Sequence, residues 1–142
     1  MQYDSKAVLI ADDEPEHVEW LADYFRAKQF AVTLVTNVGD AVREMEKKKF
    51  RAYIIDLNIP LGDWINASGS GNATYTGYQG LHIIRTAMTQ GNNGKRVVAY
   101  SAHANEQISS EIKKLYCRYV IKGRAKELKD VIKNVLDFDP LA

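Results

Sequence analysis

Short apolar runs alternate regularly with longer stretches of helical periodicity along this sequence. The runs are rich in β-branched residues and apolar on both faces, which is typical of parallel strands that helices cover on each side. Right-handed crossovers between such strands place the helices in two outer layers. The sequence therefore predicts an α/β fold, a (βα)5 three-layer sandwich. The predicted strands cover residues 7–11, 31–35, 52–55, 96–100 and 119–121.

The stretches between the runs carry apolar residues three and four positions apart, as helices with one buried face do. The last stretch shows this most clearly, with Leu128, Val131 and Val135 on one face. Asn105 precedes the fourth stretch and is a suitable N-cap residue. The predicted helices cover residues 18–25, 38–45, 81–89, 106–116 and 128–136.

Length, charge and cysteine content exclude several classes of protein. The chain has 142 residues, which fits one domain with a full core. Its net charge of +1 argues against nucleic acid or acidic lipid as a partner. Cys117 is the only cysteine, so no internal disulfide or Cys-x-x-Cys site is present in the sequence. The first apolar run is too short to span a membrane, and acids follow it where a signal peptide has small residues. We therefore expect a soluble, cytoplasmic protein without a membrane partner.

Residues 61–79 break the alternation with a long segment rich in Gly, Asn, Ser and Thr. Loops from a strand to a helix usually have about two to six residues, so a loop of this length is either functional or disordered. Aromatic and apolar residues flank its centre, residues 68–72, which favours a short hairpin there. We interpret the segment as an insertion between the third strand and the third helix.

Polar side chains follow four of the predicted strands, at the edge where an open parallel sheet binds its ligands. The first strand ends in Asp12 and Asp13, the third in Asp56, the fourth in Ser101 and the fifth in Lys122. Each residue alone has a structural alternative: a helix N-cap for Asp13, a turn for Asp56 or Ser101, and a solvated strand end for Lys122. Because all of them converge at one edge of the sheet, a shared site is the stronger interpretation.

The residue types at this edge point to a particular chemistry. Three carboxylates within a few ångströms repel one another unless they are protonated or bind a cation, and hard oxygen ligands suit a divalent ion such as Mg²⁺. With Mg²⁺ present, one carboxylate can attack a phosphoryl group and form an aspartyl phosphate. Lys122 would act as a point charge, and Ser101 as a hydroxyl donor, to the phosphoryl oxygens. The pattern therefore favours a phosphotransfer site.

Several short motifs occur in a set order along the chain. They are Asp12-Asp13, the Asp-Leu-Asn-Ile-Pro run of residues 56–60, Gly80-Leu81, Ser101-Ala102, Tyr119 and Lys122. Together they resemble the receiver domains of two-component response regulators, the CheY-like superfamily, over about residues 6–136. The resemblance implies a flavodoxin-like sheet with the strand order 2-1-3-4-5.

The resemblance also implies a phosphoacceptor and a metal site. Asp56 would be the phosphoacceptor, and Mg²⁺ would be the cofactor. The metal ligands would be Asp13 and Asp56 directly, Asp12 through water, and the backbone carbonyl of Asn58.

The same likeness implies residues that respond to phosphorylation. Ser101 and Lys122 would bind the phosphoryl group. Tyr119 would be the aromatic switch, which turns inward when the hydroxyl residue moves toward the phosphate.

Two features depart from the family pattern. A proline usually follows the lysine of the fifth strand, whereas Gly123 follows Lys122 here, and this leaves the aim of the lysine open. The second departure is the segment 61–79, which would leave the sheet beside the acidic site. It would gate phosphodonors, bind a partner or extend into solvent.

We interpret residues 1–142 as a single receiver domain, a phosphorylation-dependent switch and not an enzyme. Its implied partners are a sensor histidine kinase or a histidine phosphotransfer protein, and a downstream protein on the face of the fourth helix, fifth strand and fifth helix. The alternative is a degenerate receiver that binds proteins without being phosphorylated. A haloacid dehalogenase-type hydrolase is a distant third, because such enzymes carry Asp-x-Asp at the first strand, whereas Asp56 ends the third strand here.

Overall fold

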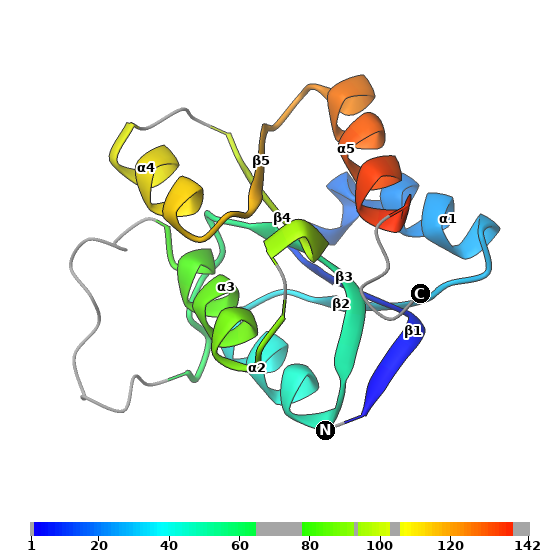
Figure 1. The fold of residues 1–142 in the computed structure, drawn as a ribbon, viewed down its shortest axis with the longest axis horizontal. Helices are drawn as coiled ribbons and strands as arrows, with labels where there is room; N and C mark the ends of the chain where they lie inside the picture. Colours follow the sequence, from blue (N-terminus) through cyan, green and yellow to red (C-terminus); the bar gives the residue numbers. More distant parts are fainter. Residues whose placement is uncertain (1, 65–77, 93, 103–105, 138–142) are drawn as a thin grey trace.

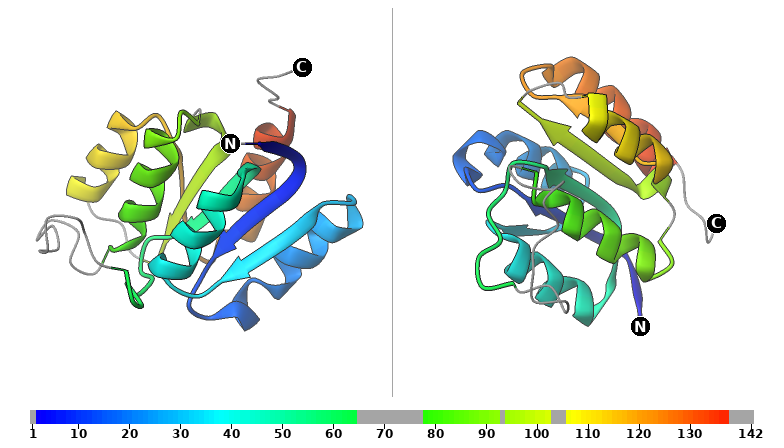
Figure 2. Two further views of the ribbon diagram at one scale, coloured as in Figure 1. Left: turned by 90° about the horizontal axis from the view of Figure 1, so that it is seen from below. Right: turned by 90° about the vertical axis from the view of Figure 1, so that its left-hand side faces the viewer.

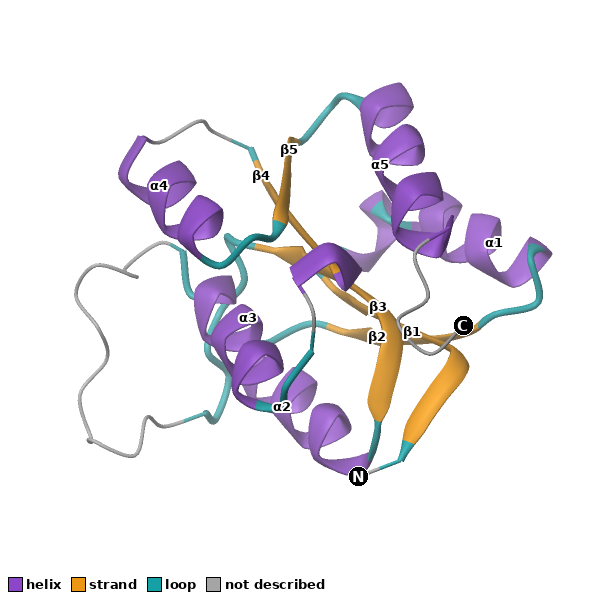
Figure 3. Ribbon diagram, in the orientation of Figure 1, coloured by secondary structure: helices purple, strands orange, loops and turns teal. Residues whose placement is uncertain are grey.

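A computed structural model describes residues 2–64, 78–92, 94–102 and 106–137. Its centre is a parallel five-stranded sheet with the order β2-β1-β3-β4-β5 (Figures 1 and 3). The flavodoxin-like order implied by the sequence motifs is thus confirmed. The strands are β1 (Tyr3–Ala11), β2 (Ala31–Val35), β3 (Lys49–Asp56), β4 (Val97–Ser101) and β5 (Arg118–Ile121).

Helices cover both faces of the sheet and complete the three layers (Figure 2). The helices α2, α3 and α4 lie on one face, and α1 and α5 lie on the other (Figures 1 and 2). Their bounds are α1 (Glu19–Ala27), α2 (Val38–Lys47), α3 (Gly80–Thr89), α4 (Glu106–Lys114) and α5 (Ala125–Asp137), with short 3-10 helices at Pro15–His17 and Gly94–Arg96.

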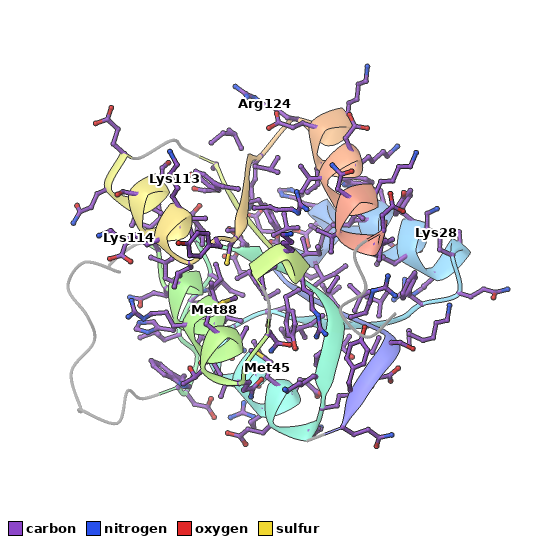
Figure 4. All side chains as sticks on the ribbon, viewed as in Figure 1. Lys28, Met45, Met88, Lys113, Lys114 and Arg124 are labelled. Carbon is purple, nitrogen blue, oxygen red and sulfur yellow. The ribbon has the colours of Figure 1, made fainter. Side chains whose placement is uncertain are left out.

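Alternate residues of each strand enter one of two apolar cores. On β1, Leu9 packs with α2, α3 and α4, and Ile10 packs with α1 and α5, and neither is exposed to solvent. Figure 4 labels Met45 on α2, which is fully buried in the first core, and Met88 on α3, which packs against it. The apolar runs of β1, β3 and β4 are therefore buried on both faces, as predicted, whereas most residues of the edge strands β2 and β5 are only partly buried.

The strands β1 and β3 begin earlier than predicted, and most of their added residues are polar and at least partly exposed, although Phe50 on β3 is fully buried. β1 starts at Tyr3, and its register against β3 shifts between Asp4 and Val8. The carboxylate of Asp4 lies 3.1 Å from Lys48 Nζ. Polar side chains on partly exposed strand ends give no apolar signal, so the sequence pattern missed them.

The connection from β3 to α3 first folds back on α2. The backbone N–H groups of Val38 and Gly39 donate to the carbonyls of Pro60 and Leu61. Arg43 reaches both carboxylate oxygens of Asp63 at 3.0 Å. The beginning of the long connection is thus held beside the first turn of α2. The predicted hairpin at residues 68–72 and the predicted cap Asn105 lie outside the described residues.

None of the helices in the described part of the chain has the length and hydropathy needed to cross a bilayer.

Candidate functional site

The carboxyl ends of β1 and β3 bring three carboxylates together. Oxygen atoms of Asp12, Asp13 and Asp56 all lie within 4.8 Å of one another. The side chains of Asp12 and Asp56 are fully buried, and that of Asp13 is exposed. Three oxygen-bearing groups at this spacing, open to solvent through Asp13, fit a hard divalent cation such as Mg²⁺. The three predicted metal-binding carboxylates are therefore neighbours in the fold.

Asp56 is held from two sides. Its Oδ1 accepts a hydrogen bond from the backbone N–H of Asn58 at 2.9 Å, and its Oδ2 accepts a hydrogen bond from Lys122 Nζ at 3.0 Å. Burial raises the pKa of Asp56, and repulsion from Asp12 adds to this, while the Asn58 N–H and Lys122 act in the opposite direction. The carboxylate of Asp56 is thus poorly solvated and lies beside one cation, Lys122. Such a position suits a carboxylate that acts as a nucleophile.

Lys122 reaches the acidic cluster from the end of β5. Its Nζ lies 3.0 Å from Asp56 Oδ2 and 3.7 Å from Asp12 Oδ2. Burial lowers the pKa of Lys122, but the hydrogen bond to Asp56 and the charges of Asp56, Asp12 and Asp13 outweigh it, so the pKa lies above its usual value. The aim of the lysine, which Gly123 left open in the sequence, is therefore toward Asp56.

Gly123 has a left-handed backbone with φ of +89°. Proline fixes φ near −65°, so this backbone excludes the proline that the resemblance to receiver domains implies at this position. A Cβ at this position would meet no atom within 4 Å. Glycine is thus favoured at this position by the backbone angle and not by lack of space.

Ser101 and Asn58 join the ends of β4 and β3. The fully buried hydroxyl of Ser101 donates to Asn58 Oδ1 at 3.1 Å. The backbone N–H of Ala102 approaches the same oxygen at 3.4 Å. The sequence motif assigned only the backbone carbonyl of Asn58 to the site, whereas the structure also places its side chain against the predicted phosphate-binding hydroxyl.

The structure corrects the helix-cap alternative for Asp13. The residue at the N-cap of the first 3-10 helix is Glu14, and no side chain caps it. The backbone N–H of Glu14 instead donates to Oδ1 of Asp12 at 2.8 Å. Asp12 therefore orders the start of this turn, and the exposed carboxylate of Asp13 is not used as the cap.

Sequence reasoning missed Tyr100, which it placed inside an apolar strand. The Tyr100 hydroxyl donates to Oδ2 of Asp12, and Lys122 Nζ lies 5.1 Å from the centre of the Tyr100 ring. Burial raises the pKa of Tyr100, and the neighbouring Asp12 carboxylate adds to this, so the phenol stays protonated. The same ring lines a pocket of about 270 Å³, together with Trp20 and Leu128.

Tyr119, His82 and Cys117 lie away from the cluster. Tyr119 is half-buried on β5 and packs against the core beneath α2, α3 and α4. His82 is buried on α3 against Trp64, with ring centres 4.6 Å apart. Cys117 is half-buried, and burial raises the pKa of its thiol to about 12.

Comparisons with solved structures identify the fold. A CheY-like response regulator receiver domain from Methanospirillum hungatei JF-1 is similar over 93% of this chain and 94% of its own, with a TM-score of 0.72 and 18% identity. The response regulator TrrA of Thermotoga maritima, solved with Mg²⁺ and BeF, covers 92% of this chain and 98% of its own, with a TM-score of 0.66 and 20% identity. The chain therefore has the fold of a response regulator receiver domain.

A third similar structure carries a metal ion. The receiver domain of a sensor histidine kinase from Pseudomonas aeruginosa PAO1 has a magnesium ion coordinated in its active site cleft. It covers 92% of this chain and 97% of its own, with a TM-score of 0.61 and 19% identity. No protein-family model matches the sequence. No curated protein matches it either.

Proposed function

We propose that this chain is a receiver domain that accepts a phosphoryl group on Asp56 and acts as a signalling switch. The observation that supports this most is the position of Asp56, buried at a strand end between Lys122 and the Asp12-Asp13 pair. The phosphodonor would be the phosphohistidine of a sensor kinase or of a phosphotransfer protein. The fold shared with receiver domains supports the proposal.

In the reaction, a carboxylate oxygen of Asp56 forms a bond to phosphorus as the bond from phosphorus to the donor histidine nitrogen breaks. Mg²⁺ bound by Asp12, Asp13, Asp56 and the carbonyl of Asn58 would supply positive charge against the phosphoryl oxygens. Lys122, already 3.0 Å from Asp56, would transfer its hydrogen bond to a phosphoryl oxygen. The attacking carboxylate of Asp56 and the ammonium of Lys122 are thus in contact before the phosphodonor binds.

Ser101 would link phosphorylation to a change of shape. Its hydroxyl now donates to Asn58, and it would turn to a phosphoryl oxygen instead. Tyr119, half-buried on the neighbouring strand, would then pack further inward and alter the face of α4, β5 and α5 that a downstream protein binds. We place this switch in the cytoplasm, in line with the single cysteine, and assign the chain no separate enzymatic substrate.

The test is incubation with acetyl phosphate and Mg²⁺, followed by intact mass measurement. The parent chain should gain the mass of one phosphoryl group, in an adduct that base and hydroxylamine remove, as expected of an acyl phosphate. Asp56→Asn is the control and should gain none. An equal adduct on Asp56→Asn, or none on the parent with several donors, would show that Asp56 is not a phosphoacceptor.

The degenerate receiver is the second candidate, favoured by the left-handed backbone of Gly123 at the position where the resemblance to receiver domains implies a proline. Such a protein would bind partners without phosphorylation. It predicts no adduct under the conditions above, with the fold unchanged.

A further inference from the structure

Tyr100 contacts one acidic and one basic side chain of the candidate site, Asp12 and Lys122. It lies on β4 with only 3% of its surface exposed. Its side chain crosses the position of β3, because β3 lies between β4 and β1 in the sheet, and its hydroxyl donates to Oδ2 of Asp12. Its ring faces the ammonium of Lys122, 5.1 Å from the ring centre. One side chain thus contacts an acid and a cation that come from different strands.

Tyr53 provides a comparison within the same sheet. It is a fully buried tyrosine on β3, and its hydroxyl accepts the backbone N–H of Phe50 at 2.9 Å. The same hydroxyl also forms a hydrogen bond with the side chain of Asn92, so it is satisfied by neutral groups away from the acidic cluster. The hydroxyl of Tyr100 is instead satisfied by a carboxylate of the acidic cluster, so its bond also fixes a side chain that the proposed reaction uses.

The bond from Tyr100 gives the second oxygen of Asp12 a hydrogen-bond donor. Oδ1 of Asp12 is taken by the backbone N–H of Glu14, and Oδ2 is taken by the hydroxyl of Tyr100. Lys122 Nζ stays 3.7 Å from this Oδ2 and makes its short contact, 3.0 Å, with Asp56. A hydrogen bond between ions is about twice as strong as a neutral one, so an Oδ2 without the hydroxyl would compete for the lysine.

We propose that Tyr100 is a positioning residue that occupies Oδ2 of Asp12 and thereby keeps Lys122 on Asp56. Its effect on phosphoryl transfer rests on the proposed function of Asp56. Its effect on Lys122 does not, since the contacts exist without phosphate.

The substitution Tyr100→Phe removes the hydroxyl and retains the ring. Lys122 should then move toward Asp12, and Mg²⁺ would have to displace an ammonium from that carboxylate. We expect Mg²⁺ to bind about two- to tenfold more weakly by calorimetry, the range that corresponds to one net hydrogen bond. In EDTA, the ε-methylene NMR signal of Lys122, assigned by its loss in Lys122→Ala, should shift. Phosphoryl uptake by Asp56 should become slower.

Two further variants separate this role from a general loss of packing. Tyr53→Phe removes an equally buried hydroxyl away from the cluster and should leave the Lys122 signal and the Mg²⁺ affinity unchanged. In an Asp12→Ala background, Tyr100→Phe should change Mg²⁺ affinity by less than about twofold, because its target is already absent.

The outcomes distinguish this proposal from the proposed function. An unmoved Lys122 signal in Tyr100→Phe, or an effect on Mg²⁺ affinity that persists undiminished in Asp12→Ala, would overturn the positioning role. A further outcome is that the Lys122 signal shifts in Tyr100→Phe, with the expected coupling to Asp12, while the parent chain takes up no phosphoryl group. This combined result would support the positioning role and reject phosphorylation of Asp56.

Discussion

The direction of Lys122 depends on the backbone of the residue after it. Gly123 has φ of +89°, and left-handed backbone is unfavourable for residues with a Cβ by roughly 1–2 kcal/mol. Lys122 is nevertheless brought to Asp56, so this loop reaches the acidic cluster with a glycine where the resemblance implied a proline. The backbone angle of Gly123 thus explains why this chain can have a glycine where a proline was expected and still keep the contact between Lys122 and Asp56.

We expect Gly123→Ala to lower the free energy of unfolding by about 1 kcal/mol, because of the backbone angle alone. Gly123→Pro should lower it further and slow phosphoryl uptake, because proline cannot adopt this φ and the loop must move with Lys122. Urea unfolding measures both. Gly123→Asn is the control, since asparagine tolerates left-handed backbone better. If Gly123→Pro is as stable as the parent, the loop angle described above is wrong.

At the scale of elements, the start of α3 is packed against the end of β3. A Cβ on Gly80 would lie 2.3 Å from the carbonyl oxygen of Asp56 and 2.8 Å from Cα of Leu57. Both atoms belong to the backbone and cannot turn away. The first residue of α3 therefore has to be a glycine for the helix to pack beside the candidate phosphoacceptor.

Gly80→Ala should destabilise the fold by about 1–3 kcal/mol and should disturb the site, because the end of β3 must shift. Helix propensity alone predicts the opposite sign, since alanine is favoured over glycine in a helix by about 1 kcal/mol. Urea unfolding and Mg²⁺ titration of the variant measure the two effects. A variant that is more stable than the parent would show that propensity outweighs the contact.

Helices and strands were predictable from the sequence where their buried faces place apolar residues at regular intervals along the chain. The strands at residues 31–35 and 96–100 and the third helix at residues 81–89 were expected within one residue of their bounds. The polar beginning of β1 was not, and neither was the short 3-10 helix at Pro15–His17, which precedes α1. Local turns of this kind depend on single hydrogen bonds, such as Glu14 N–H to Asp12, which leave no periodic pattern.

The sequence predicted which charged residues form the candidate site, but it did not predict all of the contacts between them and their neighbours. Asp12, Asp56 and Lys122 follow apolar runs directly, so the strand order alone brings them to one edge. Tyr100 lies within an apolar run, and its reach to Asp12 depends on the length of its side chain across β3. Nothing in the spacing of the residues carries that information.

At the scale of the whole molecule, the acidic cluster should destabilise the fold when no cation is bound. Asp12, Asp13 and Asp56 lie within 4.8 Å of one another, and only Lys122 offsets their charge among the described contacts. Asp13→Asn should therefore raise the melting temperature in EDTA by about 2–4 °C and weaken Mg²⁺ binding about tenfold.

Asp23→Asn is the control for this charge change, because Asp23 is exposed on α1 and pairs only with Arg26 among the described residues, at 3.3 Å. It should leave Mg²⁺ affinity unchanged. Should Asp13→Asn bind Mg²⁺ as tightly as the parent, Asp13 is no metal ligand.

We predict that a phosphoryl group on Asp56 changes the distant face formed by α4, β5 and α5. Moving such an equilibrium from 1:99 to 99:1 requires about 5.5 kcal/mol of differential interaction, which several charge-assisted hydrogen bonds to a phosphoryl group can supply. Backbone NMR of the chain with Mg²⁺ and beryllofluoride, a mimic of the phosphoryl group, tests this change of the face. We expect signals of α4 and of Tyr119 to shift in the parent and to stay in place in Lys122→Ala. Shifts confined to Asp12, Asp13 and Asp56 in the parent would contradict a switch and favour the degenerate receiver.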